Sequence, residues 1–283
     1  MSMGNYSKFQ FHPTLIFFIF ISFLTGTFVQ LFILLGIVLW HELGHFFTAK
    51  FFRWRIDRVV LWAFGGVMKT DEQGTRPLKE EIIVTLFGPL QHLFIYIVTV
   101  FLGYVELAPT TFISDLHKYN LIVLLFNLLP IYPLDGGKLV LYMLGFYLPY
   151  RKSYRMILTF SILAITLLVI FQLFYLPFTF TAVLLLLFLL VEAIKARRNE
   201  FYTFMRFLLQ RFYLQKYTLS IERIEASKET KLIDIFNRFY RNKYHHIYIN
   251  SSNYISEKDT LHYYFHKQHP QATIQDVIEL VGK

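Results

Sequence analysis

The sequence contains no cysteine and has few charged residues. Because Cys is absent from all 283 residues, disulfide bonds, thiolate catalysis and Cys-ligated metal sites are excluded. Charged residues make up 17% of the chain, whereas about 25% is usual in soluble domains. This composition argues against an ordinary water-soluble enzyme, and any metal ion must be held by imidazole and carboxylate groups.

Apolar residues are abundant where charged residues are few. They make up 55% of the chain, which includes 32 Phe, and the mean hydropathy is +0.44. Such a composition is typical of helices that face lipid. The formal net charge of +9 fits loops at the cytoplasmic surface of a membrane, so we expect no nucleic-acid partner.

Long uncharged stretches predict six membrane-spanning helices. Breaks at Gly26 and Pro177 separate neighbouring spans, and Pro130 and Pro133 interrupt the fourth span, which we expect to be a broken helix. The expected spans are residues 10–28, 30–52, 82–105, 119–150 and two within 156–191.

Basic residues orient these spans. Lys and Arg follow the second, fourth and sixth spans, whereas the loops around Gly26, residues 106–118 and Leu176 have few. The positive-inside rule then places both termini in the cytoplasm. We expect a membrane domain over residues 1–198 and a small cytoplasmic α/β domain over residues 199–283, where the composition becomes mixed and charged.

The residues from His41 to His45 form an H-E-x-x-H motif. On a helix, histidines four residues apart lie on one face, a spacing that suits zinc. Burying two imidazoles and a carboxylate in a bilayer costs several kcal/mol unless they are paired or bound to metal. The motif therefore predicts a zinc site with Glu42 as general base. The alternative is a polar cluster that joins neighbouring helices.

A catalytic zinc needs a third protein ligand, for which Asp135 and His92 are the candidates. Both residues are predicted to lie at a depth in the membrane similar to that of His41, so either could reach the zinc. Asp135 follows two prolines and precedes two glycines, so irregular backbone is expected to line a wet cavity there. This favours Asp135, and His92 is expected to form a hydrogen bond between helices.

Two further features concern the substrate. Residues 58–64 and 67–70 predict a β-hairpin with a turn at Gly65 and Gly66, whose exposed edge accepts an extended peptide as an added strand. The alternative is a loop that caps the helices. Asn127 is a candidate hydrogen-bond donor to the substrate or the intermediate, or else a polar contact between helices.

These motifs together resemble the site-2 protease family of intramembrane zinc metalloproteases. The resemblance rests on His41–His45 within a span and on Asn127–Gly136. It implies a zinc metalloendopeptidase in which His41, His45 and Asp135 hold zinc and Glu42 is the catalytic base.

Further motifs resemble the sporulation branch of this family, which removes the inhibitory pro-sequence of the transcription factor pro-sigma-K. The resemblance implies inhibitory membrane-protein partners and a location in the mother-cell membrane around the forespore. The alternatives are cleavage of another membrane-tethered regulator, or metal or ion transport, which would not need Glu42. The motifs are Trp54–Ile56, Phe64–Gly66, Arg76–Glu81, Gly88–His92 and Pro133–Lys138.

The C-terminal domain of residues 199–283, called the tail below, has patterns that predict strands at residues 221–226 and 246–249 and helices at 231–241 and 260–267. This order, with Ser256 and Asp259, resembles one cystathionine-beta-synthase (CBS) domain. The resemblance implies ATP contacts at those two residues, and a homo-oligomer because such modules work in pairs. The alternative is a substrate-docking domain. The tail's histidines are expected at the surface (His245, His246, His262, His266 and His269).

Overall fold

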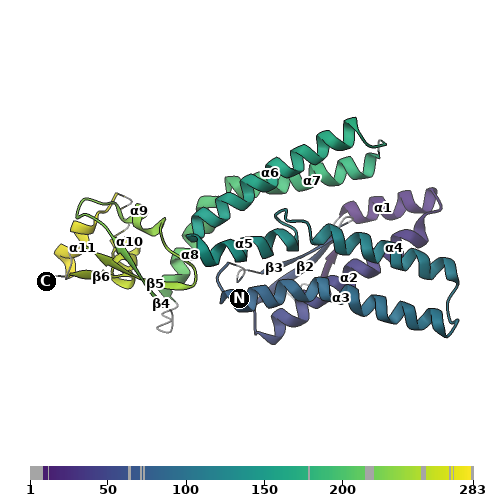
Figure 1. Ribbon diagram of the computed structural model, residues 1–283, viewed down its shortest axis with the longest axis horizontal. Coiled ribbons are helices and arrows are strands. Elements are labelled where there is room, and N and C mark those ends of the chain that lie inside the picture. Colours follow the sequence, from purple (N-terminus) through teal and green to yellow (C-terminus); the bar gives the residue numbers. More distant parts are fainter. Residues whose placement is uncertain are drawn as a thin grey trace, which may run out of the picture. The chain divides into compact units, whose positions relative to one another are not determined.

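The computed structural model is mostly helical, with two small sheets (Figure 1). It describes residues 9–11, 13–62, 65–70, 72, 74–177, 179–213, 220–249, 253–267, 269 and 271–281. The chain divides into two compact units, Met1–Leu139 and Val140–Lys283. The helices of the first unit are α1 (Pro13–Leu24), α2 (Phe28–Phe51), α3 (Leu78–Tyr104) and α4 (Thr110–Asn127), and α5 (Asp135–Tyr147) begins in it.

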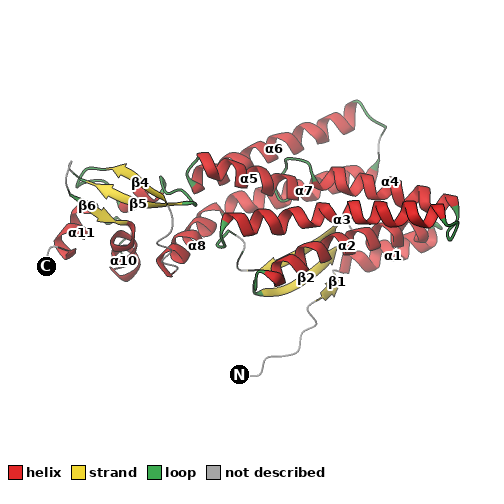
Figure 2. Ribbon diagram, turned by 60° about the horizontal axis from the view of Figure 1, so that its bottom comes forward, coloured by secondary structure: helices red, strands yellow, loops and turns green. Residues whose placement is uncertain are grey.

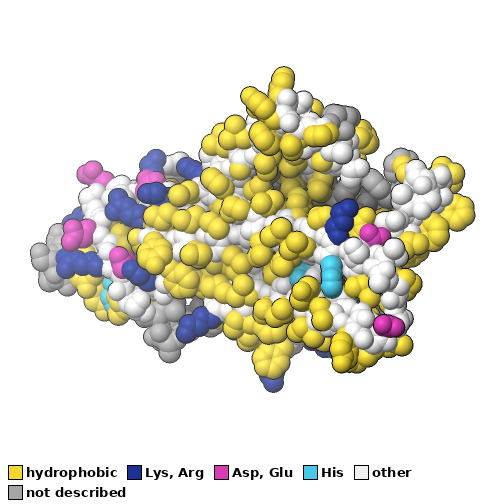
Figure 3. Space-filling view, turned by 45° about the vertical axis from the view of Figure 1, so that its right-hand side comes forward, with side chains coloured by type: hydrophobic (Ala, Val, Ile, Leu, Met, Phe, Trp, Pro, Cys, Tyr) yellow, Lys and Arg dark blue, Asp and Glu magenta, His cyan; other side chains and the backbone are white. Residues whose placement is uncertain are grey.

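Three helices in the described part of the chain are long and apolar enough to cross a membrane, namely α2, α3 and α6 (Tyr150–Phe174). Their outer faces carry exposed apolar side chains such as Phe47, Phe94 and Leu163. Hydrophobic side chains cover much of the face shown in Figure 3. The prediction of a helical membrane protein is confirmed in this coarser form. Helices α1, α4 and α7 (Phe180–Arg198) fall in or near the other predicted spans but are shorter or carry more charge.

The segment predicted as the fourth span contains a helix break as expected, but its first helix starts earlier than predicted. Helix α4 begins at Thr110, inside the segment predicted as a loop at residues 106–118. Pro109 precedes the first helical residue, where its fixed φ of −58° suits helix initiation. The charged side chains Asp115 and Lys118 favoured a loop in the sequence-based prediction, so the predicted helix start was too late in the chain. Helix α4 ends at Asn127, and α5 starts after an irregular segment at Asp135.

The sheet of the first unit has the strand order β1 (Phe9–Phe11), β2 (Ile56–Trp62), β3 (Gly65–Thr70). β1 is parallel and β3 antiparallel to β2, and the sheet lies beside the helices (Figure 2). Trp62 pairs with Gly65, so the predicted glycine turn is wrong. The strands are joined through positions 63 and 64, which lie outside the described residues, and both glycines belong to β3.

In the second unit, α6 and α7 are followed by α8 (Glu200–Tyr213) and a sheet of order β4 (Ser220–Glu225), β5 (Lys243–Tyr248), β6 (Tyr254–Ser256). β4 and β5 overlap the two strands predicted in the tail, and they pair in parallel. The predicted helix at 231–241 is only α9 (Leu232–Phe236), whereas α10 (Glu257–Lys267) was largely predicted. Strand β6 and helix α11 (Ile274–Val281) were not predicted.

The tail core includes residues from α6 and α8. Phe204, Phe207 and Leu208 of α8 are buried together with apolar residues of the tail elements. Tyr150, at the start of α6, stacks on Phe207 at 4.2 Å between ring centroids, and its N–H donates to the Phe239 carbonyl at 2.9 Å. The predicted boundary after residue 198 marks a change of composition and remains a prediction.

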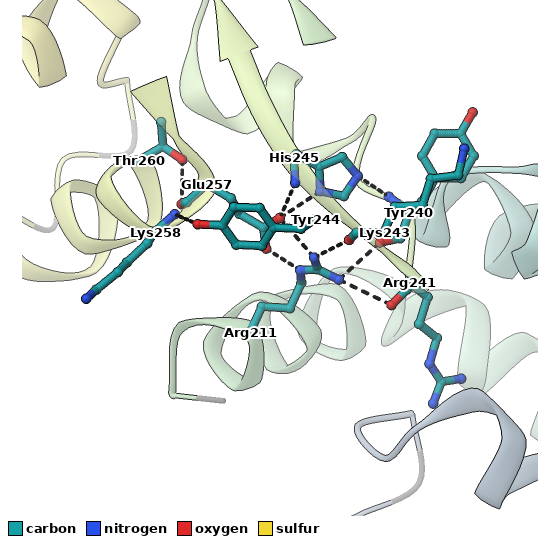
Figure 4. A network of polar contacts seen from close by, with 9 residues as sticks. All are labelled: Arg211, Tyr240, Arg241, Lys243, Tyr244, His245, Glu257, Lys258 and Thr260. Atoms are coloured by element: carbon teal, nitrogen blue, oxygen red, sulfur yellow. Dashed lines mark hydrogen bonds and ion pairs between the residues drawn. The ribbon is translucent and has the colours of Figure 1, made fainter. Parts of the chain in front are cut away.

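Arg211 of α8 binds the sheet region of the tail through several hydrogen bonds (Figure 4). Its guanidinium donates to the Glu257 carboxylate and to the carbonyls of Tyr240 and Lys243, the latter two at 3.0 and 2.5 Å. His245 donates through Nδ1 to Glu257 Oε2 at 2.7 Å and accepts the Tyr240 N–H at Nε2. The expectation that His245 lies at the surface is wrong, because this residue is fully buried.

The electrostatics of this network fit a neutral imidazole beside a carboxylate. Burial lowers the pKa of His245, and its hydrogen bond to Glu257 only partly opposes that effect. For Glu257, burial alone would raise the pKa, but the His245 hydrogen bond and the Arg211 charge outweigh it, so the pKa is lowered. The ionised Glu257 therefore keeps Arg211, and with it α8, on the tail sheet.

Candidate metal centre

Helix α2 places His41, Glu42 and His45 in the interior of the first unit, where each is less than a tenth exposed. Asp135, the first residue of α5, is buried beside them. Its Oδ2 lies 3.0 Å from Nε2 of His41 and 3.0 Å from Nε2 of His45, and the two nitrogens are 3.1 Å apart. The structure thus brings two imidazoles and a carboxylate oxygen into one small triangle.

Close backbone packing positions Asp135. A Cβ built on Gly136 would overlap the Leu128 carbonyl, and one on Gly137 would overlap the backbone of Ile131. Glycines at both positions let the start of α5 fold against the irregular segment before it. Lys138 donates from Nζ to Oδ1 of Asp135 at 3.1 Å, which leaves Oδ2 directed at the imidazoles.

The tautomer of His45 follows from its partner on α3. Its Nδ1 lies 2.8 Å from the Val84 carbonyl oxygen. A carbonyl only accepts hydrogen bonds, so Nδ1 carries the proton and donates it. The Nε2 atom of the neutral ring therefore presents a lone pair to the triangle.

The tautomer of His41 is set by a chain of hydrogen bonds through α3 and α4. Asn120 Nδ2 donates to the backbone carbonyl of His92 at 3.0 Å, which assigns the orientation of the amide. His92 Nδ1 then donates to Asn120 Oδ1 at 2.7 Å, and His92 Nε2 accepts from His41 Nδ1 at 3.0 Å. Nε2 of His41 is left with a lone pair as well.

When both rings are neutral, these tautomers direct three lone pairs, from Nε2 of His41, Nε2 of His45 and Oδ2 of Asp135, into a triangle with sides of 3.0 to 3.1 Å. Without a cation their dipoles oppose one another. Zinc bonds of about 2.0–2.1 Å separate tetrahedral ligand atoms by about 3.3 Å, so the triangle has the size and the chemistry of three zinc ligands. His92 lies behind His41, one hydrogen bond from the triangle.

Glu42 lies beside this triangle and against the sheet. One of its carboxylate oxygens is within 4.8 Å of ligand atoms of His41 and His45. A Cβ built on Gly66 of β3 would overlap Cγ and Cδ of Glu42, so only glycine permits this approach of strand to side chain. Gly88 of α3 plays the same part for the imidazoles, because a Cβ there would overlap His45 and touch His41.

Other residues singled out in the sequence have local partners. The Asn127 amide donates to the Val123 carbonyl at 3.0 Å, one turn back on its own helix. Ser256 donates its hydroxyl to Asp259 Oδ2 at 2.6 Å and accepts the Asp259 N–H at 3.2 Å, which makes Ser256 the N-cap of α10.

Sequence reasoning overlooked Asn120 and gave Gly66 the wrong role. Asn120 follows a charged stretch, where an isolated amide is unremarkable. Its place behind His92 depends on the packing of α3 against α4. Gly88 was visible only as part of a Gly-Pro motif.

Helix-borne histidines, an adjacent carboxylate and an aspartate, buried among helices apolar enough to cross a membrane, define a membrane-embedded metallopeptidase. The model of peptidase family M50 matches residues 29–118. Stage IV sporulation protein FB of Bacillus subtilis is 36% identical over 276 residues, which cover 96% of each chain.

Archaeal proteins show the same relationship. A zinc metalloprotease of Methanocaldococcus jannaschii is 33% identical over 127 residues, 44% of this chain and 37% of that protein. The solved structure of the site-2 protease from that organism matches with a TM-score of 0.55 and 26% identity, covering 66% of this chain and 89% of that one. The chain belongs to peptidase family M50 and is an intramembrane zinc protease, which confirms the family resemblance.

The hydrogen-bond chain behind His41 leads to a prediction about zinc affinity. Asn120→Leu removes the acceptor that fixes the His92 tautomer, and outer partners of metal ligands typically contribute 10- to 100-fold in affinity. We expect zinc to bind about 10- to 100-fold more weakly, measured by chelator competition on the full-length protein in detergent.

Thr99→Val serves as the matched control. It removes a partly buried hydrogen bond of 2.6 Å to His117 between the same two helices, and we expect it to leave zinc affinity unchanged. Equal affinities for wild type and Asn120→Leu would show that the amide does not orient the ligand.

Proposed function

We propose that this protease cleaves the inhibitory pro-sequence of a membrane-associated transcription factor of the pro-sigma-K type during endospore formation. The observation that carries the proposal is the similarity to a stage IV sporulation protein over 96% of both chains. It includes the tail, whereas the match to the archaeal zinc metalloprotease covers 44% of this chain.

We assign the ligand roles to His41, His45 and Asp135 on the basis of their converging lone pairs. Zinc bound there supplies a Lewis acid that activates water and polarises a peptide carbonyl. Glu42 takes the proton of the attacking water and passes it to the leaving amine. The ligand atoms of His41, Glu42 and His45 lie within 4.8 Å of one another, but Asp135 Oδ2 is 3.0 Å from both Nε2 atoms, so we assign Asp135 to the metal and Glu42 to the base.

Asn127 is proposed to donate a hydrogen bond to the substrate. It is half-buried at the last residue of α4, where the backbone becomes irregular before Asp135. Irregular backbone at membrane depth is tolerated where it borders a wet cavity. In the structure its amide donates to Val123, a bond that a substrate carbonyl would have to replace.

The substrate segment is proposed to bind as an added strand along β3. A peptide must be extended to expose its scissile carbonyl, and β3 is at an edge of the sheet within the described residues. Gly66 on that strand adjoins Glu42. A strand added there therefore runs past the catalytic base.

The proposed topology has six spans with both termini in the cytoplasm, and the protein resides in the mother-cell membrane around the forespore. The runs of Lys and Arg that end alternate spans support this orientation. Membrane proteins that hold the protease inactive until the substrate is needed are the proposed inhibitory partners.

The tail is proposed to dock the soluble part of the substrate, which raises its effective concentration near the membrane. The order β4, α9, β5, β6, α10 supports a CBS-like module, so ATP binding with homo-oligomerisation is the second candidate. The two hydrogen bonds between Ser256 and Asp259 at the start of α10 account for both side chains without a nucleotide.

The function is tested with Glu42→Gln in the purified full-length protein. The amide cannot accept the proton, so cleavage of a pro-sigma-K-type substrate should fall about 100- to 10,000-fold while zinc content stays as in wild type. Glu106→Gln, an exposed position, is the matched control. Cleavage within tenfold of wild type would exclude Glu42 as the base, and failure of the wild-type protein to cleave this substrate would favour another membrane-tethered regulator.

The strand-addition model is tested with Gly66→Ala. The added methyl group displaces Glu42 or the strand, so processing should be lost while zinc binding is retained. Gly36→Ala on α2 is the control, because a Cβ there meets nothing within 4 Å. Normal processing by Gly66→Ala would mean that β3 merely caps the helices.

The role of the tail is tested by titrating ATP against the full-length protein and by measuring substrate binding with and without residues 199–283. Docking predicts no saturable ATP binding and weaker substrate association after truncation. Saturable ATP binding that Asp259→Ala abolishes, with substrate association unchanged by truncation, would support the nucleotide-sensing alternative.

A further inference from the structure

Helix α8 has two apolar faces. Phe204, Phe207 and Leu208 are buried in the tail core. A second set lies on the other side of the helix and remains exposed to solvent. Its members are Phe201, Tyr202, Leu209 and Tyr213, which are 53%, 70%, 39% and 72% exposed. Tyr202, Leu209 and Tyr213 are spaced i, i+7, i+11, so they form one stripe along the helix, with Arg206 at i+4 among them and Phe201 about 100° to one side.

The orientation of α8 is fixed, so this stripe cannot turn inward. Arg211 points to the opposite side, where it is 11% exposed and bound to Glu257 and to backbone carbonyls of the tail (Figure 4). Rotating the helix to bury Tyr202 and Tyr213 would break these charge-assisted hydrogen bonds. The stripe is therefore a permanent surface of this unit.

Contacts with α6 set the level of α8 relative to the membrane. Glu200, the first residue of α8, accepts hydrogen bonds from Arg151 and Arg155 at 3.3 and 2.8 Å. The Arg151 guanidinium also lies over the Phe201 ring at 5.9 Å. Because α6 is an apolar helix long enough to cross a membrane, its basic first turns mark the headgroup layer. Helix α8 starts at that depth.

The charge around the start of α8 complements anionic lipid. Three guanidinium groups, of Arg151, Arg155 and Arg197, share the single buried carboxylate of Glu200. This leaves an excess of positive charge at the site. Exposed cations flank it on α6 and α7, namely Lys152, Lys195 and Arg198. Basic residues next to a span attract the negatively charged cytoplasmic leaflet.

We propose that α8 is an interfacial helix whose stripe of Tyr202, Leu209 and Tyr213 inserts into the headgroup layer of an anionic bilayer. Aromatic side chains favour this layer because their rings are apolar and the Tyr hydroxyls stay hydrated. The tail core is built partly on α8, so the same insertion holds the tail at the membrane surface. A second copy of the chain on this stripe is the competing occupant.

The absence of native cysteine makes site-specific labelling direct. Single Cys residues are introduced at Tyr202, Leu209 and Tyr213, spin-labelled, and studied in the full-length protein in phosphatidylcholine vesicles that contain phosphatidylglycerol. Accessibility to oxygen, which concentrates in lipid, is compared with accessibility to a water-soluble nickel chelate. Leu163, 60% exposed on α6, is the lipid reference, and the exposed Glu229 is the water reference.

We expect the three stripe labels to favour oxygen over nickel, with ratios between those of the two references, and to lose nickel accessibility as phosphatidylglycerol is added. Ratios equal to that of Glu229 would overturn the proposal. So would protection from both reagents that disappears when the protein is diluted in lipid, because that pattern indicates a second copy. Unchanged ratios in pure phosphatidylcholine would overturn the requirement for anionic lipid.

Discussion

The structure of the first unit depends on one constraint, the convergence of two imidazole nitrogens and a carboxylate oxygen at one buried point. Imidazole nitrogens direct lone pairs at the Asp135 carboxylate only if their other ring nitrogens are held as donors. Val84 does this for His45, and His92 does it for His41. Helix α3 supplies both partners, α4 adds Asn120 behind them, and the break before α5 brings Asp135 to the same point.

Close approach of the backbone is the second requirement, and glycine meets it at each contact. Gly88 allows α3 to lie against the imidazoles, and Gly66 allows a strand to touch Glu42. A side chain at either position would push the neighbouring element away and widen the site. The two glycines thus keep β3 close to Glu42 and α3 close to both imidazoles.

The second unit applies related physics to a different problem. Arg211 binds both oxygens of the buried Glu257 carboxylate, and His245 also donates to Oε2, so a buried polar network attaches α8 to the tail sheet. At its other end α8 shares Glu200 with arginines of α6. Helix α8 thus contacts both α6 and the tail sheet. Its stripe of Tyr202, Leu209 and Tyr213 is exposed.

The sequence by itself determined the chemistry and the class. H-E-x-x-H in an apolar stretch, the two prolines before Asp135 and the lack of cysteine restrict the metal site to imidazole and carboxylate ligands inside a helical membrane protein. These features are readable because they depend on residue type and on spacing within one element. Other features were decided only by tertiary packing. The contact of Gly66 with Glu42, the bond of Asn120 behind His92, the start of α4 at Thr110 and the burial of His245 all join residues that are distant in the chain or override local charge. No local pattern encodes such contacts, because each depends on which helix faces lie together once the chain has folded.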